Sequence, residues 1–369
     1  MTDPRVDKLA EVLVDYCTEV RPGDQVLITG DTPAEPLLKA VYAKVLKAGG
    51  HPLLLPSLPG TEELLYRHGS DEQLQHVPEP VNLIIETYDV RINVRGQANT
   101  KSLSNVDPSK IVLRSQAQTE LMKTFMQRSA SGALRWVTTL FPTDAHAQDA
   151  EMSLSEYEDF VYGACMPNLA DPVAYWRSLS AWQQRIVEWL QGKEHVRVVG
   201  PNTELELSIA GRTFINSDGK NNMPSGEVFT GPVEDSVEGH VTFSYPAIYQ
   251  GREVTGVQLW FEEGAVVKAS AQKNEEFLLK TLDTDEGSRT VGEFAIGTNE
   301  GIKAFTSQIL FDEKISGSFH MALGAGYPET GSKNESAIHW DMICDLREDG
   351  RIWVDEVLLY KNGRFVVDF

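Results

Sequence analysis

Hydrophobic positions follow a helix–strand alternation through the first part of the chain. Apolar residues recur every three or four positions in residues 6–20, which predicts an amphipathic helix, and the apolar run at 25–30 predicts a short buried strand. A helix predicted at 34–48, ended by two glycines, and a strand at 52–56 continue this order. Strands and helices that alternate in this way form parallel βαβ units, so the pattern predicts an α/β domain.

The α/β pattern extends to about residue 195. Further elements are predicted in this order: strands at 81–86 and 91–96, a mostly helical stretch at 107–131, a strand at 134–141, and helices at 153–165 and 171–192. Ser153 with Glu156 three residues later is typical of a capping box, and Asp171 before a proline is typical of a helix start. The segment TGDTPAEP after the first strand lacks the glycines of a dinucleotide-binding turn. We therefore expect a Rossmann-like domain over residues 1–195 that binds no dinucleotide.

Hydrophobic patterns with a period of two residues dominate the chain from about residue 196 onward. Alternating and β-branched runs, broken by glycine, predict antiparallel strands over most of it. The pair Asn362-Gly363 predicts a tight hairpin, and one helix is predicted at 274–281. We expect a second domain over residues 196–369, mostly antiparallel β with a few helices (α+β).

Composition and charge narrow the choice of partners. The 369 residues carry a formal net charge of −21, which argues against nucleic acid and an anionic membrane surface, since both present phosphates. The three cysteines, Cys17, Cys165 and Cys344, are scattered without a paired motif, which favours a reducing compartment. The sequence shows no secretory signal pattern and no apolar run near the ~20 residues that span a bilayer, so we expect a cytoplasmic protein.

Side chains that bind metal ions occur in the second domain, in short segments bounded by glycine. They are Glu227, Glu293, Glu313, His320, His339 and Asp341. Carboxylates and imidazoles together are ligands that Zn²⁺, Co²⁺ and Mn²⁺ accept. His339 and Asp341 are two positions apart, so on a strand both point to one face while Trp340 points to the other. The pattern predicts a divalent-metal site.

A simpler interpretation of these residues stays open at this point. A carboxylate within an apolar segment is costly to bury unless a cation lies nearby, and Arg289, Lys314 or Arg347 could supply that cation in place of a metal. His320 has apolar neighbours, which are typical of a core histidine. Three such glutamates beside two histidines favour a metal over salt bridges alone.

The number of ligands separates two chemistries. His320, His339 and Asp341 alone form a two-histidine, one-carboxylate set, which suits a mononuclear non-haem iron oxygenase. The three glutamates add enough oxygen ligands for two ions about 3.5–4 Å apart, an arrangement that activates water for hydrolysis. We therefore expect a hydrolase. An iron oxygenase is the alternative, and a non-catalytic binding protein is a third interpretation.

Several motifs together resemble the thermophilic-type metallo-aminopeptidases, the family of aminopeptidase T and aminopeptidase S. These motifs are MPSGEVFTGPVED (223–235), VGEFAIGTN, HMALG with the GY that follows it, and IHWD. The resemblance extends over roughly the whole chain and is most specific from residue 223 onward. It implies a metal-dependent aminopeptidase that removes N-terminal residues from short peptides, forms a homodimer, and encloses its site in a cavity.

The resemblance also implies roles for particular residues. All six metal-type residues would bind two divalent ions (Zn²⁺, Co²⁺, Mn²⁺ or Mg²⁺), with Glu293 bridging them. Tyr327 would stabilise the oxyanion of the tetrahedral intermediate, so Tyr327 and Glu293 are the expected catalytic residues.

The sequence departs from the family in one segment. FDEKISGSFH, which contains Glu313, stands where the family has a DEN-type segment with its acid closer to the histidine. A dihydroxypyridine-cleaving dioxygenase is similar in general scaffold and keeps only the histidine and aspartate ligands. The resemblance therefore leaves the mononuclear iron oxygenase as the alternative function.

Overall fold

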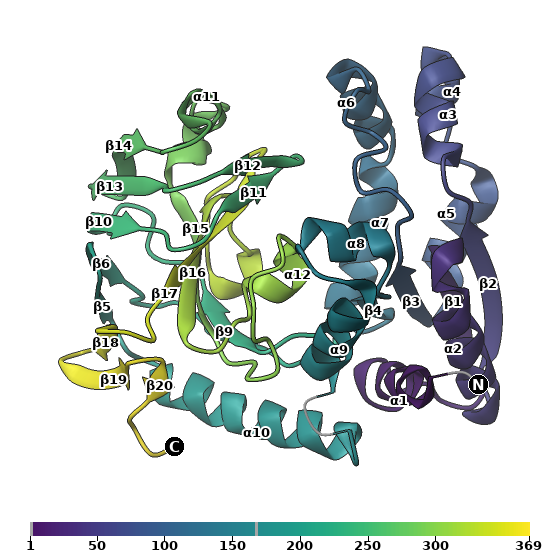
Figure 1. The fold of residues 1–369 in the computed structure, drawn as a ribbon, viewed down its shortest axis with the longest axis horizontal. Helices are drawn as coiled ribbons and strands as arrows, with labels where there is room; N and C mark the ends of the chain where they lie inside the picture. Colours follow the sequence, from purple (N-terminus) through teal and green to yellow (C-terminus); the bar gives the residue numbers. More distant parts are fainter. Residues whose placement is uncertain (1–2, 167–168) are drawn as a thin grey trace. The chain divides into compact units, whose positions relative to one another are not determined.

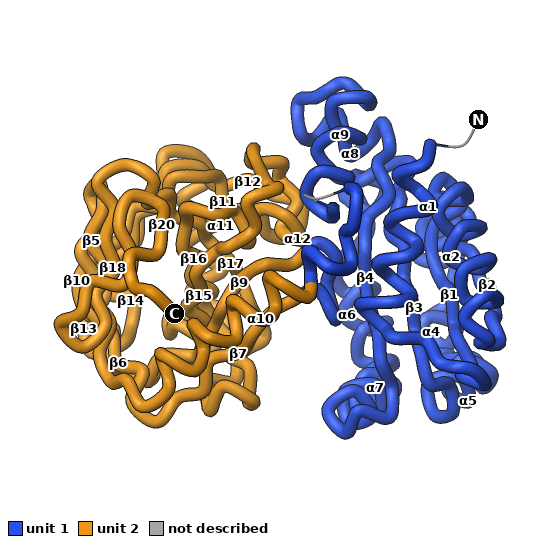
Figure 2. Tube along the Cα trace, turned by 90° about the horizontal axis from the view of Figure 1, so that it is seen from below, with its two compact units in different colours: residues 1–176, 219–224 blue, residues 177–218, 225–369 orange. Residues whose placement is uncertain are grey.

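The computed structural model describes residues 3–166 and 169–369, and the chain divides into two compact units (Figure 2). Unit 1 comprises residues 1–176 and 219–224, and unit 2 comprises residues 177–218 and 225–369. The first division falls inside the long helix α10 (Pro172–Leu190), ahead of the boundary expected near residue 195. The reason is that Ile186 and Leu190 on this helix belong to the apolar core of unit 2.

Unit 1 is built on a parallel sheet with the strand order β2-β1-β3-β4-β8 (Figure 1). Its strands are β1 (Gln25–Asp31), β2 (His51–Ser57), β3 (Val90–Arg95), β4 (Arg135–Leu140) and the very short β8 (Asn222–Met223). Central strands of such a sheet are covered on both faces, which explains the continuous apolar run of β1. The parallel sheet and the first, second, fourth and fifth predicted strands are confirmed.

Helices join these strands, and those predicted at 6–20, 34–48, 107–131 and 153–165 are confirmed. The helices are α1 (Pro4–Glu11) continued by the π-helical turn η1 (Val12–Cys17), the 3₁₀ turn η2 (Thr32–Ala34), α2 (Glu35–Lys47), α3 (Thr61–His68), α4 (Asp71–Gln75), α5 (Glu79–Thr87), α6 (Pro108–Ala117), α7 (Thr119–Ala130), α8 (Asp144–Asp149) and α9 (Leu154–Cys165). The capping box at the start of α9 forms as predicted, because Ser153 and Glu156 bond to each other's backbone amides. Asp171 caps α10 through the amide of Ala174.

One predicted strand is wrong, because residues 81–86 lie in helix α5. The apolar run there suggested a strand, but only Ile85 is buried, against Phe125 and Leu134, which is the single-sided contact of a helix. A proline near the start of α5 favours the first helical turn. Arg128 donates to the carbonyls of Ile85 and Tyr88 and so satisfies the end of the helix.

Unit 2 contains two large antiparallel sheets, with strand orders β14-β13-β10-β6-β5-β18-β19-β20 and β17-β16-β15-β9-β7, and the ribbon β11-β12. The strands are β5 (His195–Gly200), β6 (Thr203–Ser208), β7 (Ile215–Ser217), β9 (Glu227–Thr230), β10 (Glu238–Thr242), β11 (Ala247–Tyr249), β12 (Arg252–Val254), β13 (Gln258–Glu262), β14 (Ala265–Ser270), β15 (Val291–Gly297), β16 (Ser318–Gly324), β17 (His339–Asp345), β18 (Arg351–Val354), β19 (Val357–Lys361) and β20 (Arg364–Phe365). The predicted hairpin is confirmed, because Asn362 and Gly363 both adopt positive φ between β19 and β20.

A single apolar core joins both large sheets of unit 2 to α10 and to α11 (Glu275–Leu282). It includes Val198 and Leu205 from the eight-stranded sheet and Phe294 and Met321 from the five-stranded sheet. Sheets that share a core in this way turn their other faces outward, and the five-stranded sheet uses that other face for polar side chains. Within the described residues, no helix combines the length and apolar character needed to cross a bilayer.

Candidate metal centre

Five of the six residues predicted as metal ligands lie on the polar face of the five-stranded sheet. On β17, Trp340 points into the core, so His339 and Asp341 on either side share the opposite face, as their spacing predicted. Glu293 on β15 and His320 on β16 are each followed by a core residue, which sends their own side chains to the same polar face. Alternation along three strands therefore collects two carboxylates and two imidazoles.

The strand register brings these side chains next to one another. Ala322 on β16 pairs with Glu293 on β15 and with Asp341 on β17, so only a methyl group separates the two carboxylates in the sheet. Glu227 begins β9 beside the core residue Val228 and pairs with Gly297 at the end of β15. The cluster is thus assembled from four neighbouring strands.

Glu293 lies between the two histidines. Its Oε2 is 3.3 Å from Nε2 of His339, and its Oε1 is 3.6 Å from Nε2 of His320. Nε2 of His339 is also 3.4 Å from Oδ1 of Asp341. Two ligand atoms that each lie ~2.1 Å from one ion, at ~90–110° to each other, are ~3.0–3.4 Å apart. Glu293, His339 and Asp341 therefore have the spacing of ligands to one ion.

Three overlapping groups could each hold an ion, and their ligand atoms lie within 4.8 Å of one another. These groups are Glu227–Glu293–His320, Glu293–His339–Asp341 and Glu313–His320–Asp341. Within the described structure, Oε2 of Glu227 and Oδ1 of Asp341 are buried and accept no hydrogen bond. Leaving a carboxylate oxygen in that state is costly unless a cation contacts it, so the cluster fits divalent ions.

Backbone carbonyls orient both imidazoles. Nδ1 of His320 lies 2.9 Å from the carbonyl oxygen of Glu313, and Nδ1 of His339 lies 2.8 Å from that of Ala325. A carbonyl oxygen only accepts, so each Nδ1 carries the hydrogen and each Nε2 faces the carboxylates. This orientation is the usual one for histidines that bind metals.

Glu313 joins the cluster from outside the sheet, at the C-terminal end of the short helix α12 (Ile309–Asp312). Its carboxylate contacts the ammonium of Lys314, which lies 3.6 Å from Oε1 of Glu227 and is fully buried. Of the three basic residues considered as substitutes for a metal, Arg289 and Arg347 instead pair with aspartates outside the cluster. Lys314 alone of these three lies among the metal-type residues.

For Glu293 and both histidines, burial and the neighbouring charges shift the pKa in opposite directions. Burial alone would raise the pKa of Glu293, but the imidazoles of His320 and His339 hold it at about 2. Burial alone would lower the pKa of each histidine, but the carboxylates raise the pKa of His339 to about 12 and of His320 to about 10. Burial raises the pKa of Glu313 to about 8. Without a metal ion, the carboxylates thus keep both imidazoles protonated, and an ion that binds must displace the proton from each Nε2.

Tyr327 lies at the open side of the cluster, with 38% of the residue exposed. Its ring packs edge-on against the imidazole of His339, with centroids 5.3 Å apart, and against Phe229 at 5.4 Å. Partial burial of the side chain and the charge of Glu293 raise the pKa of Tyr327 above its usual range, so the phenol stays protonated. The side chain can therefore donate a hydrogen bond beside His339.

Gln183 is a supporting residue that sequence reasoning missed. It is fully buried on α10, and its Nε2 donates to Asn216, to the main-chain carbonyl of Ser217 and to that of Glu227. Its Oε1 accepts from the hydroxyl of Thr298. The amide thus fixes the strand end that carries Glu227. The only sequence signal was a polar residue at a core position of an amphipathic helix.

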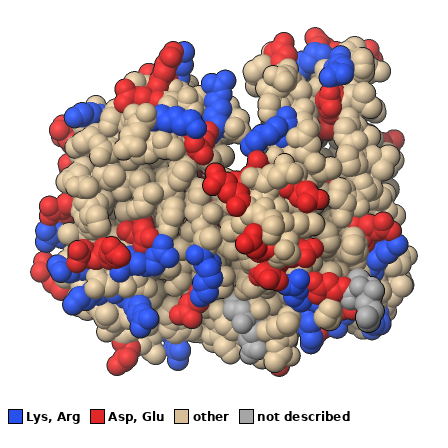
Figure 3. Space-filling model, viewed as in Figure 1, with Lys and Arg blue, Asp and Glu red and all other residues tan. Residues whose placement is uncertain are grey.

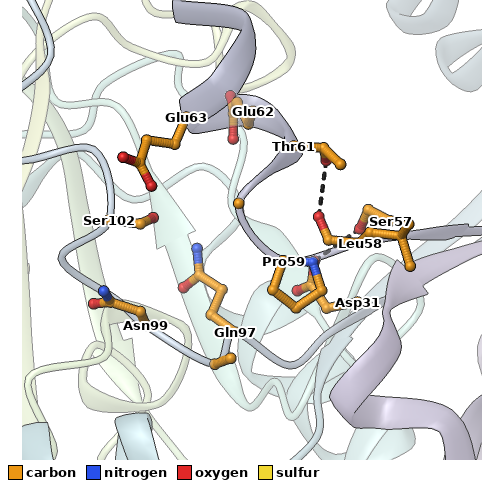
Figure 4. A pocket seen from close by; sticks show the side chains of 12 residues that line it. Asp31, Ser57, Leu58, Pro59, Thr61, Glu62, Glu63, Gln97, Asn99 and Ser102 are labelled. Carbon is orange, nitrogen blue, oxygen red and sulfur yellow. Dashed lines mark hydrogen bonds between the residues drawn. The ribbon is translucent and has the colours of Figure 1, made fainter. Parts of the chain in front are cut away.

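A separate hollow in unit 1 lies at the carboxyl ends of β1, β2 and β3 (Figure 4). Ligands often bind at this edge of a parallel sheet. Here, however, Ser57 donates to Asp31, which also accepts from the amide of Gly96, so these polar groups satisfy one another. The three candidate metal groups found among the described residues all lie in unit 2.

On the face shown in Figure 3, acidic and basic side chains are interspersed.

Sequence comparison finds proteins that are described as metalloproteases or aminopeptidases. A sequence model of the family described as Thermophilic metalloprotease (M29) matches residues 2–365. Aminopeptidase 2 of Geobacillus stearothermophilus is 26% identical, with 94% of each chain covered, and Aminopeptidase T of Thermus thermophilus is 26% identical, with 98% of each covered.

Solved structures agree on the fold. Wild-type AmpT from Thermus thermophilus superposes with a TM-score of 0.85 at 24% identity, covering 99% of each chain. The 2,5-dihydroxypyridine dioxygenase of Pseudomonas putida KT2440 superposes with a TM-score of 0.59 at 12% identity, covering 98% of this chain and 97% of its own. At these identities both structures establish a shared fold.

Proposed function

Because the chain belongs to the thermophilic metalloprotease family (M29), we propose that it is a metal-dependent aminopeptidase that removes N-terminal residues from short peptides. The observation that carries the proposal is the position of Glu293 between the two histidines, with a different oxygen toward each. A carboxylate in that position joins two ion sites. The similar proteins named aminopeptidase support the choice of substrate.

The proposed centre holds two divalent ions. Glu293, His339 and Asp341 would hold the first, and Glu227, Glu313 and His320 would hold the second, with Glu293 bridging. When bound, such ions supply Lewis acidity to the scissile carbonyl and lower the pKa of water.

The side chains around the ions have separate tasks. Glu293 orients the attacking water between the histidines. The Tyr327 hydroxyl donates a hydrogen bond to the oxyanion that develops on the substrate carbonyl. Ala322 leaves only a methyl group between Glu293 and Asp341. The main-chain carbonyls behind the two histidines keep each Nε2 directed at the centre.

The finer points of the proposal concern setting and assembly. We assign catalysis to unit 2 (residues 177–218 and 225–369) and a supporting role to the Rossmann-like unit 1. The metal is Zn²⁺, Co²⁺, Mn²⁺ or Mg²⁺, the protein works in the cytoplasm, and the assembly is a homodimer. Neither nucleic acid nor a membrane is a partner, in keeping with the net charge of −21.

The experiment that tests the function combines metal content with hydrolysis. Purified protein is analysed for bound metal and assayed on Leu-p-nitroanilide and dipeptides before chelation, after it, and after each metal is restored. Chelator-sensitive release of N-terminal residues, lost in Glu227→Gln and Glu293→Gln together with bound metal, supports the aminopeptidase. One iron per chain, oxygen-dependent ring cleavage and no hydrolysis with any metal would replace it with the dioxygenase.

A further inference from the structure

Lys314 is a buried cation inside the proposed metal centre. Its side chain has no exposed surface, which is rare for lysine, and its ammonium contacts the carboxylate of Glu313. The same ammonium lies 3.6 Å from Oε1 of Glu227. Both carboxylates are proposed metal ligands, so the centre has a positive charge of its own before any ion binds.

The ammonium contacts ligands of only one of the two proposed ion positions. Glu227 and Glu313, the carboxylates beside Lys314, occur only in the ligand groups that include His320. Neither occurs in the group Glu293–His339–Asp341. The ammonium therefore competes for the oxygen atoms at the His320 position, and its charge acts more weakly on Asp341 at the His339 position.

The backbone holds Lys314 firmly in this place. Its amide donates to the carbonyl of Phe311 at the end of α12, and its carbonyl accepts from the amide of Asn299. Gly297 lets the segment approach β15, since a Cβ added there would lie 2.2 Å from the carbonyl oxygen of Ile315. Gly297 is also the register partner of Glu227, which explains why the ammonium and that carboxylate meet.

We infer that Lys314 makes the two ion positions unequal: one ion binds tightly at Glu293, His339 and Asp341, and the second binds weakly beside His320. The inference rests on the proposed metal centre. A like charge a few ångströms from a divalent ion in a poorly solvated site repels it strongly. The ammonium also uses one oxygen of Glu227 and one of Glu313. At low free metal the enzyme thus holds one ion per chain, with Lys314 supplying the charge of the other.

The test measures binding rather than turnover. Metal-free wild type, Lys314→Met and Lys314→Gln are titrated with Zn²⁺ by calorimetry, and bound zinc is counted after equilibrium dialysis at several free concentrations. Lys303→Met is the matched control, because Lys303 is exposed on the nearby loop. The Lys314→Gln variant keeps a hydrogen-bond donor for the two carboxylates, so it replaces Lys314→Met as the test variant if methionine disturbs folding.

The expected result is two separate binding steps in wild type and in Lys303→Met. Both Lys314 variants should bind the second ion at least tenfold more tightly and the first ion as before. Equal affinities for both ions in wild type would overturn the inference. A second step that is unchanged or weaker in both Lys314 variants would also overturn it, and would give Lys314 the role of holding the carboxylates in place. Wild type that binds no Zn²⁺ at all would refute the metal centre itself.

Discussion

Replacing Gln183 by methionine should destabilise the protein although it keeps the size of the side chain. The amide makes two hydrogen bonds to fully buried partners, the carbonyl of Glu227 at 3.0 Å and the hydroxyl of Thr298 at 2.9 Å, and two more to partly buried ones. Each buried polar group left without a partner costs about 1–3 kcal/mol. The carbonyl of Ser217 keeps other donors, Ser225 and the amide of Gly226, so its loss counts little. The sum over the two fully buried partners is about 2–6 kcal/mol.

Urea unfolding followed by circular dichroism measures this loss, with the free energy of unfolding extrapolated linearly to water. Gln184→Met is the matched control, because Gln184 is the next residue on the same helix and is exposed. We expect the control to stay within about 0.5 kcal/mol of wild type. Gln183→Met should also bind Zn²⁺ less tightly, since the strand end carrying Glu227 is released. If the two variants unfold within 1 kcal/mol of each other, the supporting role of Gln183 is refuted.

Three further predictions concern other parts of the molecule. Tyr327→Phe should keep metal content and ring packing but lower kcat about 10²–10³-fold, as expected for one oxyanion donor; an unchanged kcat contradicts the assignment. Ala322→Val should fill the space between Glu293 and Asp341, so zinc retained on dialysis should fall while cooperative unfolding persists; full metal content would argue against this. Burial lowers the pKa of His146 to about 4, so its folded form resists the proton that the unfolded chain accepts near pH 6.5. The contribution of His146 to the free energy of unfolding is full above pH 6.5 and falls as the pH drops toward 4, by about 2 kcal/mol at pH 5. The free energies of unfolding of wild type and His146→Phe, measured in urea, should diverge by this amount between pH 7 and 5. An equal change with pH in both proteins would refute the prediction.

Local patterns predicted the fold where local forces decide it. The run at 25–30, the capping box of Ser153 and the turn at Asn362 each depend on neighbouring residues, and each forms as predicted. The run at 81–86 was ambiguous, because a short apolar segment fits either a strand or one side of a helix. Only the contact of Ile85 with residues from other elements decides between them.

The candidate site could be predicted in kind but not in arrangement. The spacing of His339 and Asp341 on a strand was enough to place both on one face. That Glu293 lies across Ala322 from Asp341 depends on the register of strands distant in sequence, which no local pattern specifies. Lys314 was considered as a rival to a metal, whereas in the structure it lies beside the same carboxylates that a metal would use.

The strand β8 has a consequence for how this chain is made. Residues 219–224 return to unit 1 only after the chain has entered unit 2, and β8 then pairs with β4. During synthesis, β4 therefore remains an unpaired edge strand until Met223 has been added to the chain, and unpaired edge strands promote aggregation. A gene fragment that stops near residue 195 would leave that edge exposed permanently. We expect such fragments to be insoluble and unit 1 to need the later segment supplied in the same chain.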